Sequence, residues 1–138
     1  IAMIIKRLNP PGSPTPKNYS HVVSVEGGRT IYLAGQIAFD ENRNIVGGDD
    51  VVAQTRQALK NLKRNVEAAG ASMSDMVKIN TYVVNYDQGQ LLGIIDVIGE
   101  FFPAPNQPTN TLLGIECLAA EGLLIEIEGI AVTDKPLG

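Results

Sequence analysis

The stretch DVVAQTRQALKNLKRNVEAAG, from Asp50 to Gly70, carries the clearest structural signal in the chain. Side chains that suit a buried helix face recur in it at spacings of three and four: Val52, Thr55, Leu59, Leu62, Val66 and Ala69. Asp49 or Asp50 can cap the first turn, and Gly70 suits the left-handed residue that follows a helix. This pattern predicts an amphipathic helix that ends near Ala69.

Strand-like segments lie on both sides of this helix. Three precede it (4–8, 21–26 and 29–36) and three follow it (76–84, 110–118 and 123–132). A second helix is expected from Asp87 to Phe101, and Gly27-Gly28 is expected to form a hairpin turn between the second and third strands. This order indicates an α+β fold, a mixed β-sheet with two helices on one face. Since several strands are apolar on both sides, the uncovered face needs a partner, which predicts self-association.

The composition is that of an ordinary globular domain. The 138 residues are 44% hydrophobic and 19% charged, so we expect one domain over 3–138, with residues 1–2 as non-native residues ahead of a start at Met3. The net charge of -4 argues against a nucleic-acid partner. No apolar run approaches the roughly 20 residues that span a bilayer, and no signal peptide is evident, so a cytoplasmic location and no membrane partner are expected.

Cysteine and histidine are scarce. Cys117 is the one cysteine and His21 the one histidine, which excludes an internal disulfide and the usual zinc sites. We therefore expect neither a metal nor a cofactor. Cys117 is expected to be buried on an apolar strand.

Several separate blocks of the chain resemble the Rid (reactive intermediate deaminase, YjgF-like) family. They are 33–37 (LAGQI), 50–62, 66–70, 76–83, the pair 101–102 and 125–132 (IEIEGIAV). The resemblance implies a chorismate-mutase-like fold and a homotrimer in which three sheets line a central barrel and three small-molecule clefts lie between subunits. It also implies hydrolysis of imines or enamines, such as 2-aminoacrylate, to a carbonyl compound and ammonia.

The same resemblance implies site residues. Glu126 would hold the attacking water as the catalytic group, and Tyr19, Gly35 and Gln36 would bind substrate. Asn110 stands where the family has an arginine that grips the substrate carboxylate, with Thr111 beside it as a second neutral donor. Because Asn is neutral and no other cation is evidently placed to replace the arginine, we expect a neutral or non-amino-acid-derived substrate.

Other interpretations of these residues remain open. Glu126 and Glu128 alternate with Ile125 and Ile127, so both carboxylates could simply belong to a solvated sheet face. Asn110 could simply mark the start of a strand that follows a proline, with no role in binding.

Other functions remain open as well. The main alternative to a deaminase is a non-catalytic trimer that binds or senses a small molecule. A translation-inhibitor or endoribonuclease-type function is disfavoured, because the chain has one histidine and a net negative charge.

Overall fold

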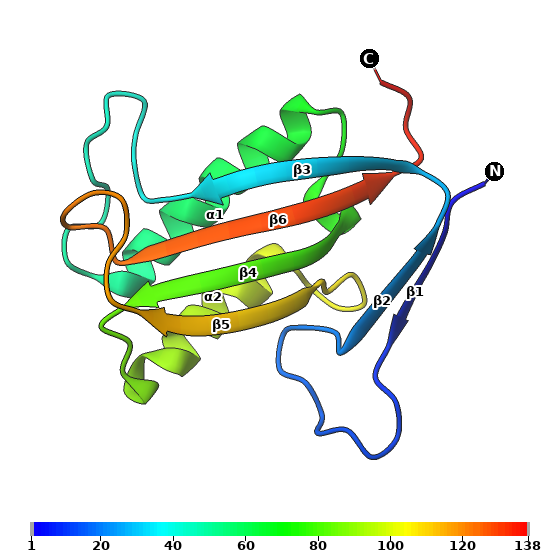
Figure 1. Ribbon diagram of the computed structural model, residues 1–138, viewed down its shortest axis with the longest axis horizontal. Helices are drawn as coiled ribbons and strands as arrows, with labels where there is room; N and C mark the ends of the chain where they lie inside the picture. Colours follow the sequence, from blue (N-terminus) through cyan, green and yellow to red (C-terminus); the bar gives the residue numbers. More distant parts are fainter. Residues whose placement is uncertain (1, 138) are drawn as a thin grey trace.

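A four-stranded mixed sheet with two helices on one face forms the body of the molecule, and a separate two-stranded sheet lies at its side (Figure 1). This computed structural model describes residues 2–137. The strands are β1 (Ile4–Leu8), β2 (Val22–Glu26), β3 (Arg29–Gln36), β4 (Met76–Val84), β5 (Thr109–Ile115) and β6 (Ile125–Thr133). The helices are α1 (Val51–Ala68) and α2 (Leu91–Phe101). Two short 3₁₀ turns are η1 (Met73–Asp75), just before β4, and η2 (Gln88–Gln90), which leads directly into α2. The predicted α+β class with two helices and a mixed sheet is confirmed.

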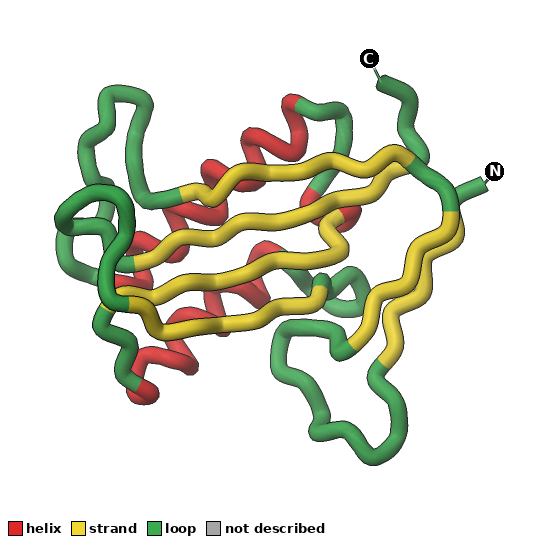
Figure 2. The backbone as a smooth tube through the Cα atoms, viewed as in Figure 1, coloured by secondary structure: helices red, strands yellow, loops and turns green. Residues whose placement is uncertain are grey.

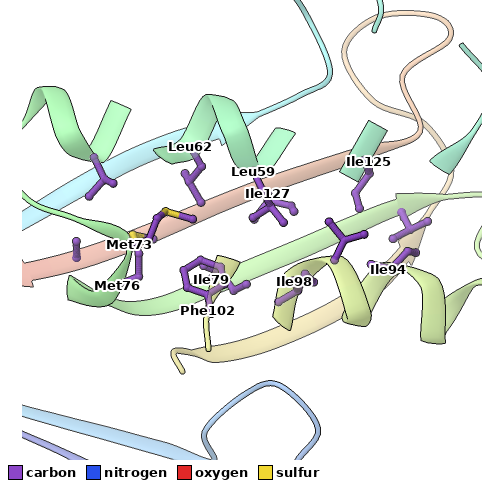
Figure 3. Packing of buried hydrophobic residues seen from close by; sticks show 14 of the residues in the cluster. Leu59, Leu62, Met73, Met76, Ile79, Ile94, Ile98, Phe102, Ile125 and Ile127 are labelled. Carbon is purple, nitrogen blue, oxygen red and sulfur yellow. The ribbon is translucent and has the colours of Figure 1, made fainter. Parts of the chain in front are cut away.

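The larger sheet has the order β3-β6-β4-β5, in which β4 and β5 are parallel and the other pairs antiparallel. Helix α1 begins where Asp50 accepts hydrogen bonds from the N–H groups of Val52 and Ala53, as an N-cap should. Both helices cover the same face of the sheet, behind the strands in Figure 2. The core lies between these layers, and its fully buried side chains include Leu59, Leu62, Ile79, Ile94, Ile98, Phe102, Ile125 and Ile127 (Figure 3).

The expected hairpin between β2 and β3 is wrong. β2 pairs with β1 and β3 pairs with β6, so these neighbours in sequence belong to different sheets. Gly27 and Gly28 have φ of 71° and 80°, which lets the chain turn from one sheet into the other. A Cβ on Gly28 would lie 2.7 Å from Val132 Cγ1, so this turn is pressed against the end of β6.

The prediction for Cys117 is also wrong. β5 ends at Ile115, opposite Val84, the last residue of its partner β4. Cys117 therefore falls in the irregular segment before β6, where it is exposed.

Among the described residues, no helix is both long and apolar enough to cross a membrane. Among residues 2–137, no helix or further strand layer covers the sheet face opposite the helices (Figure 1). Tyr32 on this open face is 79% exposed and Leu113 49%, which leaves an apolar surface of the kind that proteins bury against a partner.

Candidate functional site

Tyr19 is held next to β5 by the residue that follows it. The N–H of the buried Ser20 donates to Pro108 O at 2.9 Å, and its hydroxyl donates to Gln107 O at 2.6 Å. These bonds fasten the loop between β1 and β2 to the backbone just before Asn110. Tyr19 also meets the ring of His21 edge-on, with ring centroids 5.2 Å apart.

A second anchor fastens the same loop to α2. Asn18, at a φ of 61°, donates from Nδ2 to Ile95 O at 2.8 Å. Gly99 makes this approach possible, since a Cβ there would lie 2.7 Å from Asn18 Cγ. Residues 18–20 are thus fixed between α2 and the start of β5.

These anchors shape a pocket of about 300 Å³ at the β5 edge of the molecule, which we call the edge pocket. Its polar lining comes from Thr15, Lys17, Asn18, Tyr19 and Asn110. Its apolar lining comes from Leu91, Ile95, Ile98 and Leu112. Asn110 Oδ1 accepts a hydrogen bond from the buried Thr81 Oγ1 at 3.0 Å, which orients the amide. A pocket of this size and composition suits a small ligand with a hydrocarbon part.

Two carboxylates lie on the open face of the sheet, in different surroundings. Glu128 accepts a short hydrogen bond from the Tyr82 hydroxyl and another from Asn80 Nδ2 at 3.2 Å. These bonds hold the pKa of Glu128 below its usual value. Within residues 2–137, no group donates a hydrogen bond to Glu126, and its pKa is raised by desolvation and by the nearby charge of Glu128. Glu126 is therefore the carboxylate that remains free to hold a water molecule.

Gly35 lies against Glu126. A Cβ on Gly35 would overlap the Oε2 atom of Glu126 and lie 2.7 Å from its Cδ. The neighbouring Gln36 pairs with Ile127 and donates from Nε2 to Ala34 O at 3.1 Å. The absence of a side chain at position 35 thus leaves the space in which the Glu126 carboxylate sits.

The predicted site residues consequently form two groups. Tyr19 and Asn110 line the edge pocket, on the helix-covered side of the sheet, whereas Gly35, Gln36 and Glu126 come together at β3 and β6. Glu126 is on the open face, and β4 separates its strand from β5, so about 10 Å of sheet lies between the two strands. A single chain therefore does not bring the Glu126 carboxylate to a ligand in the edge pocket.

Thr111 neither lines the edge pocket nor contacts the group around Glu126. It pairs across the sheet with Asn80, so its exposed side chain points to the open face, opposite to that of its neighbour Asn110. Whether these residues bind substrate stays a prediction.

Lys17 and Asn18 are pocket residues that sequence reasoning missed. Their position directly before Tyr19 was an available signal, but only the folded loop shows that Lys17 reaches the pocket that contains Asn110. The expectation that no other cation is placed to replace the arginine did not consider Lys17, which lines the same pocket as Asn110. Within the described range there is no cluster of three or more His, Cys, Asp or Glu that could hold a metal ion.

Comparison with known proteins gives a consistent match. Residues 12–133 match the family model described as Endoribonuclease L-PSP. The chain is 36% identical over 128 residues to a 2-iminobutanoate/2-iminopropanoate deaminase from Dermatophagoides farinae, which covers 92% of this chain and 95% of that protein.

Solved structures agree with this match. The crystal structure of YyfB from Yersinia pestis, described as a protein of unknown function of the Rid family, superposes with a TM-score of 0.90 at 40% identity, covering 94% of this chain and 98% of that one. RidA from an Antarctic Psychrobacter superposes with a TM-score of 0.68 at 27% identity, covering 86% and 97% of the respective chains.

Proposed function

Because the chain belongs to the Rid (YjgF-like) family, we propose that it hydrolyses small imines or enamines to a carbonyl compound and ammonia. The observation that carries the proposal is the contrast between its two open-face carboxylates. Glu128 is tied by Tyr82 and Asn80, whereas Glu126 accepts no hydrogen bond from the described residues and has a raised pKa. Neighbouring carboxyl groups whose pKa values are pushed apart are typical of acid–base sites.

The reaction needs little more than an oriented water. Glu126 accepts a proton from the water as its oxygen attacks the imine carbon, and the electron pair of the C=N bond moves to nitrogen. The protonated Glu126 then returns that proton to nitrogen, which gives a carbinolamine. Glu126 next takes the proton of the carbinolamine hydroxyl and passes it to the amine nitrogen, so the C–N bond breaks, ammonia leaves and the C=O bond of the product forms. Desolvation and the charge of Glu128 raise the pKa of Glu126, which makes its carboxylate a stronger base for taking the proton from water.

The hydrocarbon part of the substrate is assigned to the edge pocket. Leu91, Ile95, Ile98 and Leu112 supply its apolar wall. Tyr19 and Asn110 supply neutral hydrogen-bonding groups at its polar side. Such a lining suits a short aliphatic chain next to a polar reacting centre.

The separation of the two groups supports self-association, and the resemblance to the Rid family implies that three subunits assemble. Since one chain places Glu126 and the edge pocket on opposite sides of its sheet, we assign the complete cleft to two subunits, one that supplies Glu126 and Gly35 and one that supplies Tyr19 and Asn110. The exposed Tyr32 and Leu113 on the open face supply apolar area for the contact. Light scattering should give about three times the chain mass of 14.7 kDa, and a monomer would remove this cleft.

Ammonia release from imines generated in situ tests the reaction. Glu126→Gln keeps the shape of the side chain but cannot accept a proton, so we expect kcat/KM to fall about 10²- to 10⁴-fold. Glu41→Gln is the matched control, since Glu41 is an exposed loop residue, and it should retain full activity. Full activity of folded Glu126→Gln would refute the role of Glu126. Absence of turnover in the native chain, with a small molecule still bound, would favour a binding or sensing protein.

A further inference from the structure

The edge pocket contains one charged side chain. Of its nine lining residues, Lys17 alone carries a charge, whereas Asn110 and the others are neutral. A carboxylate that enters an apolar pocket needs a compensating cation, because burying an unpaired charge is very costly. Asn110 cannot supply that charge, so Lys17 is the residue on which anion binding in this pocket would depend.

The backbone that carries Lys17 is fixed, but its ammonium group is not. Residues 18 and 20 are hydrogen-bonded to Ile95 O and Pro108 O, which holds position 17 at the pocket rim. The lysine itself is exposed, and its flexible four-carbon stem lets Nζ reach a ligand.

Lys17 forms an ion pair with Asp96, which competes only weakly with a ligand carboxylate for the lysine. Lys17 Nζ lies 3.7 Å from Asp96 Oδ1 on α2, with side chains 56% and 62% exposed. Ion pairs so exposed contribute little, because water screens both charges and two long side chains lose freedom. A ligand carboxylate with a second donor can therefore displace Asp96.

Asn110 supplies that second donor. Its Oδ1 accepts from Thr81 Oγ1 at 3.0 Å, which leaves Nδ2 as the amide group available to the pocket. A charged donor from the loop and a neutral donor from β5 together make a two-point contact with the two oxygens of a carboxylate.

We propose that Lys17, on the loop before Tyr19, is the specificity-determining cation of this cleft, and that Asp96 competes with the ligand for it. The inference rests on the proposed function and narrows its substrates to imines that bear a carboxylate and a short aliphatic chain. It replaces the expectation of a neutral substrate, which rested on Asn110 and on finding no other cation placed to replace the arginine.

The test compares two ligands of nearly the same shape, 2-oxobutanoate and its neutral amide 2-oxobutanamide. Their dissociation constants are measured on the full chain by NMR titration at low ionic strength. The native protein should bind the anion more tightly. Lys17→Gln should weaken anion binding on the order of 3- to 10-fold without changing amide binding, and Lys17→Arg should retain the preference. Asp96→Asn should strengthen anion binding about twofold, since the competing carboxylate is removed.

Lys60→Gln is the matched control, because Lys60 is exposed on α1 and does not line the edge pocket. An equal loss for both ligands in Lys17→Gln, or no loss for the anion, would overturn the inference, since a merely structural role does not discriminate ligand charge. Ammonia release separates this from the proposed function. If ammonia is released but the preference for the anionic ligand does not depend on Lys17, the inference alone is refuted. If the preference depends on Lys17 but no ammonia is released, the proposed function alone is refuted.

Discussion

Replacing Gly35 by Ala should lower activity by as much as ~10²-fold while leaving the fold intact. The added Cβ would overlap Oε2 of Glu126 and lie 2.7 Å from its Cδ and 2.8 Å from its Cγ, whereas ordinary van der Waals contact begins at 3.4 Å. The Glu126 carboxylate must therefore retreat from its present place. A displacement of about 1 Å of a catalytic group can cost as much as ~10²-fold in rate.

The cost to stability should be small for two reasons. Gly35 lies in β3 outside the left-handed region, so Ala introduces no backbone strain there. The atoms it meets belong to the flexible end of Glu126, which can move without disturbing the core. We expect the free energy of unfolding to change by less than about 1 kcal/mol, since the lower entropy of the unfolded Ala chain offsets part of the contact.

The assay is kcat/KM for ammonia release, measured beside urea unfolding. Gly89→Ala is the control, because Gly89 is exposed, also lies outside the left-handed region, and would place its Cβ at an ordinary 3.4 Å from Asp87 Oδ2. Full activity of folded Gly35→Ala would refute the placement of the Glu126 carboxylate against Gly35. A large loss of stability would refute the claim that the contact is confined to a flexible side chain.

Two further predictions follow from hydrogen bonds and charges around the site. Desolvation and, next to it, the charge of Glu128 raise the pKa of Glu126, and the base works only when ionised, so activity should fall as the pH drops through that raised pKa. Glu128→Gln should move this acid limb of the kcat/KM profile to lower pH, and a limb that stays or rises would contradict the assignment. Asn61→Ala should lower the free energy of unfolding, measured in urea, by about 1–3 kcal/mol. Asn61 Nδ2 donates to Ile37 O at 2.8 Å and to Phe39 O at 2.9 Å in the half-buried loop that follows β3, and the variant loses both bonds. An unchanged unfolding midpoint would mean that water replaces both bonds.

Much of the fold could be predicted from the periodicity of the chain. The spacing of apolar residues in α1 and the alternation in β6 follow directly from helix and strand geometry, so the element order and the two-helix α+β class could be read from them. The partner of a strand is harder to predict, because it depends on distant residues. The turn at Gly27-Gly28 suggested a hairpin, yet β3 pairs with β6 from the other end of the chain.

The candidate site, too, could be predicted from the sequence only in part. Glu126, Tyr19 and Asn110 could be picked out from the sequence, because each lies in a short segment that can be matched to the Rid family. The sequence alone did not show that Glu126 faces away from Asn110, since the faces of two strands are related only through the register of β4 between them. Nor did it place Lys17 at the edge pocket. That position depends on hydrogen bonds from the loop to α2 and to the segment before β5, which join residues 77 and 87 positions apart along the chain. Such contacts exist only once the tertiary structure has formed.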